Sequence, residues 1–241
     1  MADYLSVGVL GGMGPGSTVR FLDLLIRRFH SQLGSCRNSE FPQIILRTVP
    51  SSDHMGKQAS EGTGREILAE LRALAEDSVG FIVCPCNSAH GIILGSNVPR
   101  VLPLPAAMRE LIAWDRVGSR TLLLSTRSTQ MSGMYEELFT THGGRLIHLG
   151  DADQSALNEI ILSNNHGITK NSSSHVLTEI VSRYQVNSIL IACTEISNYL
   201  IESDLYSIDS LEVLAEAAFL VSSRSNELKQ FSAESSLPAR R

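Results

Sequence analysis

The chain has 241 residues, of which 43% are hydrophobic and 19% charged, and its 20 Lys and Arg against 25 Asp and Glu give a formal net charge of −5. This length can bury a hydrophobic core without disulfides or a structural metal, and the composition excludes a wholly disordered chain. The acidic balance without a Lys/Arg-rich run disfavours nucleic acid as a partner. The apolar runs are too short to cross a bilayer and the first residues carry no secretory signal, so we expect no membrane partner and a cytoplasmic protein whose four cysteines are thiols.

Short apolar runs alternate with segments of helical period along most of the chain. Two clear helical stripes, Leu22–Phe29 and Ile67–Ala75, have apolar residues every three or four positions. The strands between such segments read as continuous apolar runs, which is typical of parallel sheets covered on both faces. The sequence therefore predicts an α/β fold. The expected strands, in chain order, are Ser6–Leu10, Gln43–Thr48, Val79–Cys84, Val101–Leu104, Ser119–Ser125, Arg145–Leu149, Asn187–Cys193 and Tyr206–Ile208.

The two halves of the chain have a similar layout. A strand, a turn of small residues and a helix begin at Val7, and the same order begins at Arg120. Later in each half, a strand ends in a cysteine followed by polar residues, at Cys86 and at Cys193. Any α/β chain repeats strands and helices, but the paired cysteine endings favour two related halves. We expect residues 1–115 together with 210–225 to form the first half, 116–209 the second, and 226–241 a loose polar tail.

The Gly-rich turn after the first strand has two main interpretations. Gly11, Gly12, Gly14 and Gly16 lie between a strand and a helix, where backbone N–H groups can hold an anion. The dinucleotide-binding fingerprint fails, because Ser17 stands where its third glycine is required, and the sequence of a P-loop is also missing. The glycines indicate either a tight turn alone or a small-anion site, and a nucleotide site is the weakest alternative.

Cys86 and Cys193 each follow a predicted buried strand and precede a helix. Ligands bind at this edge of an open α/β sheet, and a helix N-terminus stabilises a thiolate. The residues that follow, Asn87-Ser88 and Thr194-Glu195, have side chains and amides that could hold a carboxylate. Two thiols at matching places suit one reaction in particular. One thiolate removes a proton from a carbon next to a carboxylate, and one thiol returns a proton to the opposite face.

Other interpretations of the cysteines remain open. Cys86 and Cys193 could be buried structural residues. A metal site from Cys84, Cys86, His90 and Cys193, or a redox disulfide between Cys84 and Cys86, is less favoured because Cys-x-Cys has the wrong spacing for either. Cys36 reads as a loop thiol and Cys84 as a core residue. His90 could share a helix face with Cys86 and tune it, or be a satisfied structural histidine.

The chain carries Gly11-Gly-Met-Gly-Pro, Cys86-Asn-Ser-Ala-His and Cys193-Thr-Glu in this order. Together they resemble the three hallmark motifs of the aspartate/glutamate racemase family, and its aspartate racemase branch in particular. The turn from Thr126 to Tyr135 and the later Ile208-Asp-Ser also match that branch, so the resemblance extends to about residue 224. It implies a pseudo-symmetric α/β fold of two parallel-sheet halves with the active site in the cleft between them. It further implies two-base racemisation without pyridoxal phosphate, any other cofactor or a metal, usually in a homodimer.

Carried onto this chain, the resemblance makes Cys86 and Cys193 the two acid/base thiols. The other implied residues would bind a small amino-acid or carboxylate substrate. Asn87, Ser88 and Thr194, with Glu195 beside them, would hold the α-carboxylate of the substrate. Met13 and Gly14 would line the pocket through the Gly-rich turn. Thr126 and Thr129 of the second half would contribute hydroxyl groups.

Two further expected substrate-binding positions depart from the family pattern. Where the family has an arginine and a lysine that hold a side-chain carboxylate, this chain has Ser52 and Asn165. Neither residue can form a charge-assisted ion pair, so we expect weaker selection for a dicarboxylic amino acid. Nearby His54, Lys57 or Lys170 could compensate.

The sequence thus predicts a cofactor-independent amino-acid racemase of the aspartate/glutamate type. Two alternatives share the same fold. One is a cysteine-dependent cis–trans isomerase or decarboxylase, in which one thiol acts as nucleophile or lone proton donor. The other is a catalytically silent protein that binds an amino acid or carboxylate, and the substituted cationic positions motivate it.

Overall fold

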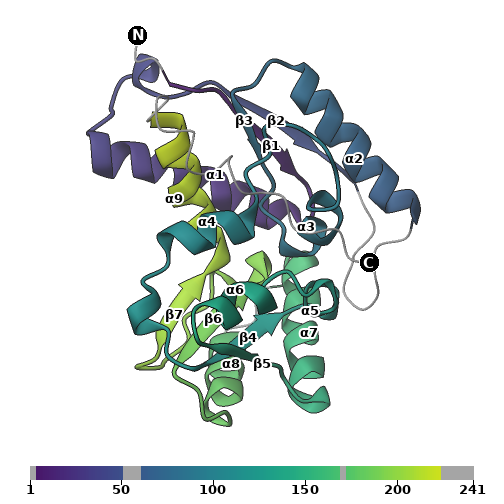
Figure 1. Ribbon diagram of the computed structural model, residues 1–241, viewed down its shortest axis with the longest axis vertical. Helices are drawn as coiled ribbons and strands as arrows, with labels where there is room; N and C mark the ends of the chain where they lie inside the picture. The colour runs from purple at the N-terminus through teal and green to yellow at the C-terminus, as the bar shows by residue number, and fades with distance from the viewer. Residues whose placement is uncertain (1–3, 51–60, 169–171, 224–241) are drawn as a thin grey trace.

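The computed structural model describes residues 4–50, 61–168 and 172–223. Its described strands form two parallel sheets, one in each half of the chain (Figure 1). The α/β class and the two parallel-sheet halves predicted from the sequence are confirmed. The first sheet has the order β2 (Ile44–Thr48), β1 (Val7–Gly11), β3 (Phe81–Val83), and the second has the order β5 (Arg145–Ile147), β4 (Arg120–Ser125), β6 (Ser188–Ala192), β7 (Tyr206–Asp209).

Helices join the strands and cover the sheets, as expected for parallel strands that need crossover connections. The first β–α unit of each half is the same, since α1 follows β1 and α5 follows β4 within a few residues. The α-helices are α1 (Pro15–Leu33), α2 (Glu61–Glu76), α3 (Asn87–Ile93), α4 (Leu104–Leu111), α5 (Arg127–Ser132), α6 (Glu136–Thr141), α7 (Asp151–Asn165), α8 (Ser173–Ser182) and α9 (Ser210–Ser223), and the short 3-10 helices are η1 (Asn38–Glu40), η2 (Trp114–Arg116) and η3 (Thr194–Ile196). No helix in the described part of the chain is both long and apolar enough to span a membrane.

Seven of the predicted strands are present, with ends that differ by no more than two residues. The predicted strand Val101–Leu104 is wrong. Val101 makes a single parallel bridge to Ile82, and α4 begins at Leu104. The reason is the pair Pro103 and Pro105, which place a proline at the N-cap and another in the first turn of α4. Proline has no N–H to donate to a sheet, whereas the first turn of a helix leaves that N–H without a partner.

Helix α9 carries the chain from the second sheet back to the first. It follows β7 directly and packs against α1 and α4 (Figure 1). Phe219 of α9 meets Phe29 of α1 edge-to-face, with ring centroids 5.0 Å apart. One buried cluster includes Val9 of β1, Leu123 of β4 and Leu190 of β6, so the core is continuous between the halves. The division of the chain at 115/116 and 209/210 stays a prediction. The predicted tail, 226–241, lies outside the described residues.

The Gly-rich turn is tight because two of its glycines have no room for a side chain. A Cβ on Gly11 would lie 2.4 Å from Cγ2 of Thr18. A Cβ on Gly12 would lie 2.8 Å from both the backbone N and O of Val49. The N–H of Gly12 donates to Oγ1 of Thr18 at 2.9 Å, which fixes the turn against the first turns of α1. These glycines therefore serve packing, which is the first of the two interpretations of this motif.

Replacing Gly12 with alanine should destabilise the protein, because its φ is +94° and the new Cβ would overlap with the backbone of Val49. We expect Gly12→Ala to lower the free energy of unfolding by roughly 1–3 kcal/mol, measured from the urea transition. Gly16→Ala in the same turn is the matched control, since a Cβ there meets nothing within 4 Å. Equal stability of the two variants would contradict this explanation of the turn.

Candidate active site

Cys86 lies where the first half changes from strand to helix. It follows β3 and is the N-cap residue of α3, and its side chain is 9% exposed. The backbone N–H groups of Ser88 and Ala89, in the first turn of α3, act to lower the pKa of this thiol. The predicted placement of a thiol at a helix N-terminus is therefore observed.

Cys193 has the matching place in the second half. It follows β6 and is the N-cap residue of η3, and its side chain is 3% exposed. Its thiol Sγ donates to Oε2 of Glu195 at 3.2 Å. The backbone dihedral angles of the two cysteines are nearly the same, φ −149° and ψ 114° at Cys86 against φ −142° and ψ 114° at Cys193. The two halves thus present their thiols on the same local backbone.

The carboxylate of Glu195 joins the two halves at this point. Its Oε1 accepts from the N–H of Gly14 at 3.1 Å and from Oγ of Ser17 at 2.9 Å, both at the start of α1. Its Oε2 accepts from Cys193, and Oγ1 of Thr194 lies 3.4 Å from the same oxygen. The N-terminus of α1 therefore does bind an anion, as the second interpretation of the Gly-rich turn requires, but here the anion is a side chain of the protein's other half.

Both thiols are held in their protonated form in this arrangement. Burial, followed by the negative charge of Glu195, raises the pKa of Cys86 to about 12. The same two causes raise the pKa of Cys193 well above its usual value, and the Cys86 thiolate would raise it further. The sequence led us to expect that helix N-termini would favour a thiolate. The N–H groups of α3 do lower the pKa of Cys86, but desolvation and the neighbouring carboxylate of Glu195 outweigh them.

Three hydroxyl groups from the two halves meet beside Cys86. Oγ of Ser88, in α3, lies 2.9 Å from Oγ1 of Thr126 and 3.2 Å from Oγ1 of Thr129, and the two threonine oxygens are 3.2 Å apart. Thr126 is the N-cap of α5 and accepts from the N–H of Thr129. The structure therefore brings together three residues that the sequence analysis assigned to substrate binding, at the starts of two helices.

Asn87 is predicted to hold the substrate's carboxylate, but its side chain has protein partners on both sides. Its Nδ2 donates to Oγ of Ser210 at 2.9 Å, and its Oδ1 accepts from the hydroxyl of Tyr135 at 2.5 Å. Asn87 is 2% exposed. The sequence analysis did not single out Ser210 or Tyr135, although both lie in the stretches that carry the family resemblance, since only the folded chain shows what they contact.

The remaining predicted binding residues that the structure describes are Met13, Gly14 and Asn165, and they lie at the Gly-rich turn. Met13 is 8% exposed and belongs to the same buried cluster as Cys86. A Cβ on Gly14 would lie 2.9 Å from Oε1 of Glu195 and 3.1 Å from Oδ1 of Asn165, so both of these side chains touch the turn. Ser52 lies outside the described residues, as do His54, Lys57 and Lys170.

Asn164 and Ser17 also hold this region together, and the sequence analysis gave neither a role in the site. Asn164 donates through Nδ2 to the backbone oxygen of Glu195 at 2.9 Å. It is the neighbour of Asn165 at the end of α7, and Ser17 follows the Gly-rich turn directly. Their places next to predicted site residues are the one signal in the sequence that could have identified them.

His90 is a structural histidine by its contacts. It is fully buried, and its Nδ1 lies 2.9 Å from the backbone oxygen of Cys86, one helical turn away. Burial lowers the pKa of His90 to about 4, so the ring is neutral at physiological pH.

Among the described residues no group of three or more His, Cys, Asp and Glu side chains could hold a metal, so Cys84, Cys86, His90 and Cys193 do not form the metal site considered above. Cys84 is buried and Cys36 exposed, both as predicted.

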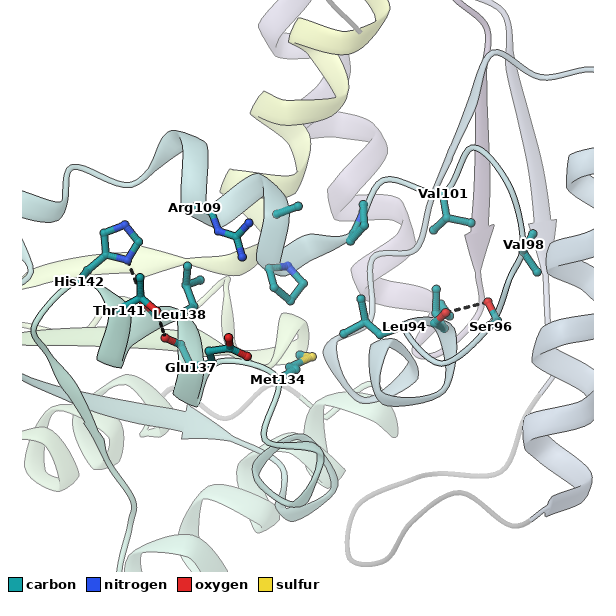
Figure 2. Close-up of a pocket in the computed structure, with 14 residues that line it drawn as sticks. Leu94, Ser96, Val98, Val101, Arg109, Met134, Glu137, Leu138, Thr141 and His142 are labelled. Atoms are coloured by element: carbon teal, nitrogen blue, oxygen red, sulfur yellow. Dashed lines mark hydrogen bonds between the residues drawn. The ribbon is translucent and has the colours of Figure 1, made fainter. Parts of the chain in front are cut away.

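A cavity of about 490 Å³ is lined by residues from both halves (Figure 2). Its wall is formed by the end of α3, the segment before α4, α4 itself and α6, through Ile93, Leu94, Ser96, Val98, Val101, Pro103, Pro105, Ala106, Arg109, Met134, Glu137, Leu138, Thr141 and His142. None of the described residues that we placed in the site lines it. The cysteines are therefore buried next to Glu195 rather than open to this cavity.

The model of one protein family, described as Asp/Glu/Hydantoin racemase, matches residues 10–218 of the chain. The match covers both cysteines, the Gly-rich turn and Glu195. The chain belongs to the Asp/Glu/Hydantoin racemase family. The resemblance noted in the sequence is thereby confirmed, and with it the prediction of a racemase, an enzyme of the isomerase class.

Relatives within this racemase family agree with the assignment. The chain is 26% identical over 221 residues to the "Broad specificity amino-acid racemase RacX" of Bacillus subtilis (strain 168), which covers 88% of this chain and 95% of that protein. Its fold is similar to that of the Picrophilus torridus aspartate racemase, with a TM-score of 0.69 and 22% identity over 89% of this chain and 92% of that one. The glutamate racemase from Thermus thermophilus is similar with a TM-score of 0.63 and 17% identity over 96% of this chain and 84% of that one.

Neutralising Glu195 should make both candidate thiols more reactive. Glu195→Gln removes a negative charge that raises the pKa of Cys86 and of Cys193, so each pKa falls and the thiolate fraction at a given pH rises. We expect iodoacetamide to alkylate both cysteines severalfold faster at pH 8, relative to the exposed Cys36 of the same molecule, as measured by peptide mass spectrometry.

Glu202→Gln, at an exposed glutamate of the same half, is the control and should leave the alkylation rates of Cys86 and Cys193 relative to Cys36 unchanged. If Cys86 and Cys193 are alkylated no faster, relative to Cys36, in Glu195→Gln than in the control, the charge of Glu195 does not set the reactivity of the two thiols.

Proposed function

We propose that this protein is a cofactor-independent amino-acid racemase in which Cys86 and Cys193 act as the two acid/base groups. One observation carries the proposal. Two thiols from the two halves occupy equivalent N-cap positions, and the charge of the same carboxylate, Glu195, acts on both. Inversion of a carbon needs one acid and one base on opposite faces, and a pair of equivalent thiols can supply both.

The reaction follows from this symmetry. The thiolate of one cysteine removes the proton from Cα of the amino acid, and the electron pair left on Cα is delocalised into the neighbouring carboxylate. The thiol of the other cysteine then gives its proton to the opposite face of Cα. The product is the other enantiomer, and the two cysteines have exchanged protonation states, so the reverse reaction uses the same groups with their roles exchanged.

A base must first form, because burial and Glu195 keep both thiols protonated in the free site. Glu195 is the group placed to take a proton, since its Oε2 already accepts a hydrogen bond from Cys193 at 3.2 Å. Substrate binding supplies a positive charge at the same time, because every amino acid carries an α-ammonium group. An ammonium beside the Cys193 thiolate lowers the pKa of that thiol, so deprotonation accompanies binding.

The three hydroxyl groups of Ser88, Thr126 and Thr129 are suited to the α-carboxylate. They lie 2.9–3.2 Å from one another at the N-termini of α3 and α5, where backbone N–H groups also favour an anion. Charge that develops on the carboxylate as Cα loses its proton would be stabilised by these donors. We do not assign the Asn87 side chain to the carboxylate, because it is already bonded to Ser210 and Tyr135.

The side-chain end of the site favours substrates other than dicarboxylic amino acids. Asn165, which touches the Gly-rich turn beside Glu195, is neutral where the family has a lysine. The one charged side chain among the described residues that we assign to the site is that of Glu195, which repels a second carboxylate of a substrate. The broad specificity in the name of the Bacillus relative is consistent with this proposal. By the family resemblance, we also propose a homodimer located in the cytoplasm.

Replacing either cysteine should abolish racemisation. With a panel of L- and D-amino acids in deuterated buffer, we expect the wild-type protein to exchange the α-hydrogen and invert the centre together. Cys86→Ser and Cys193→Ser should each lower kcat for inversion by at least about a thousandfold, because a serine hydroxyl is a far weaker acid than a thiol and forms almost no anion at neutral pH.

Cys36→Ser, at the exposed cysteine, is the control and should match the wild type. Wild-type inversion rates in both single variants would refute the two-base mechanism. A covalent cysteine adduct on mass spectrometry would favour the isomerase or decarboxylase alternative, and ligand-induced stabilisation without any exchange would favour a silent binding protein.

Restoring the missing cation should shift the substrate preference. We expect Asn165→Lys to raise kcat/KM for aspartate or glutamate, relative to an amino acid with a neutral side chain, by about tenfold or more, since the lysine pairs with the second carboxylate. Leu162→Lys adds the same charge at an exposed position of α7 and should leave the ratio unchanged. An unchanged ratio in Asn165→Lys would show that this side chain does not face the substrate.

A further inference from the structure

Asp209 and Ser210 form the junction at which the chain passes from the second half to the first. Asp209 is the last residue of β7, paired in register with Ile191 of β6, and Ser210 is the first residue of α9. Strand β6 leads directly to Cys193, whereas α9 packs against α1 and α4 of the first half. Two neighbouring residues therefore belong to different halves of the fold.

Ser210 contacts the segment that carries Cys86. Its Oγ accepts from Nδ2 of Asn87 at 2.9 Å, and Asn87 is the first residue of α3, directly after Cys86. Ser210 and Asn87 are 0% and 2% exposed, so this hydrogen bond is shielded from water. The hydroxyl of Tyr135, from the second half, bonds to the other side of the same amide at 2.5 Å. The first turn of α3 is thus held by α9 and by the second half at once.

Asp209 contacts the segment that carries Cys193. Its Oδ1 accepts from Oγ of Ser197 at 2.9 Å. Ser197 is the C-cap of η3, the short helix whose N-cap is Cys193. The same Oδ1 caps α9, since it accepts from the N–H of Leu211 at 2.8 Å. Asp209 therefore joins the far end of the Cys193 turn to the start of α9.

We propose that Asp209 and Ser210 are positioning residues that fix the two thiol-bearing turns relative to each other. Neither side chain is assigned to the substrate. Each bonds to a residue close in sequence to one cysteine, and the two are covalently adjacent, so the spacing of the thiols is set through one rigid junction. The inference rests on the proposed racemase function, because two-base inversion is the chemistry that requires the two thiols to stay at a fixed separation around one carbon.

Two serine variants each cut one of these contacts. Ser210→Ala removes the acceptor of Asn87, and Ser197→Ala removes the donor to Asp209 while leaving the cap of α9 in place. We expect each to lower kcat by about tenfold with KM within about twofold of the wild type. The α-deuterium isotope effect on kcat should rise, because proton transfer by a misplaced thiol becomes the slow step.

Ser222→Ala is the matched control. Ser222 is a buried serine at the other end of α9, and its Oγ donates to the backbone oxygen of Leu5 at 2.8 Å. Its loss removes a part-buried hydrogen bond of the same helix without touching either thiol segment. We expect a lower stability but an unchanged kcat per folded molecule and an unchanged isotope effect. A merely structural role of Ser210 would give the same result as this control.

Alkylation of the thiols tests the positioning role without reference to activity. Relative to Cys36 in the same molecule, Cys86 should react severalfold faster in Ser210→Ala, and Cys193 should do so in Ser197→Ala, because each variant frees one turn. Ser197 is only partly buried, so its variant tests the proposal even where Ser210→Ala does not fold.

The outcomes separate this proposal from the proposed function. A wild-type protein that exchanges no α-hydrogen with any amino acid would overturn the racemase function, and the alkylation pattern would still decide the positioning role. If the wild-type protein is active and Ser210→Ala and Ser197→Ala match Ser222→Ala in kcat, isotope effect and alkylation, the positioning role alone is overturned.

Discussion

The Glu195 carboxylate is the group through which the two halves of this protein meet at the candidate site. Two donors from the start of α1, the N–H of Gly14 and the hydroxyl of Ser17, hold one of its oxygens, and the thiol of Cys193 donates to the other. A carboxylate shared between a helix N-terminus and a buried thiol fixes the relative placement of the two sheets at this point. It also sets the charge that both cysteines experience, so packing and reactivity depend on the same contact.

In the proposed two-base mechanism, this electrostatic arrangement keeps both thiols protonated in the free site and lets them act as bases once a substrate is bound. Burial and the charge of Glu195 raise the pKa of Cys86 to about 12 and that of Cys193 well above its usual value, so neither is a thiolate in the free site. A protonated thiol is a poor nucleophile and resists oxidation. In the proposed mechanism, the positive charge of a bound amino-acid substrate reverses this balance, so reactivity would be confined to the bound complex.

The second link between the halves is the junction of β7 with α9. It returns the chain to the first half next to both thiol-bearing turns, through Asn87 on one side and Ser197 on the other. The hydroxyl groups of Ser88, Thr126 and Thr129 add a third contact between the halves. All three links lie at the carboxyl ends of parallel strands, which is where this class of fold places its ligands.

The sequence by itself determined the fold class, seven of the eight strands, and the placement of Cys86 and Cys193 after strands, because periodicity and strand-end residues are local properties of the chain. It failed locally at Val101–Leu104, where two prolines favour a helix start. Only the tertiary structure decided which groups surround the thiols. The bonds of Glu195 to Gly14 and Ser17, and of Asn87 to Ser210, join residues more than 120 positions apart, which no local pattern encodes. The direction of the thiol pKa shifts depends on burial and on those distant partners, so it too was decided by the folded chain.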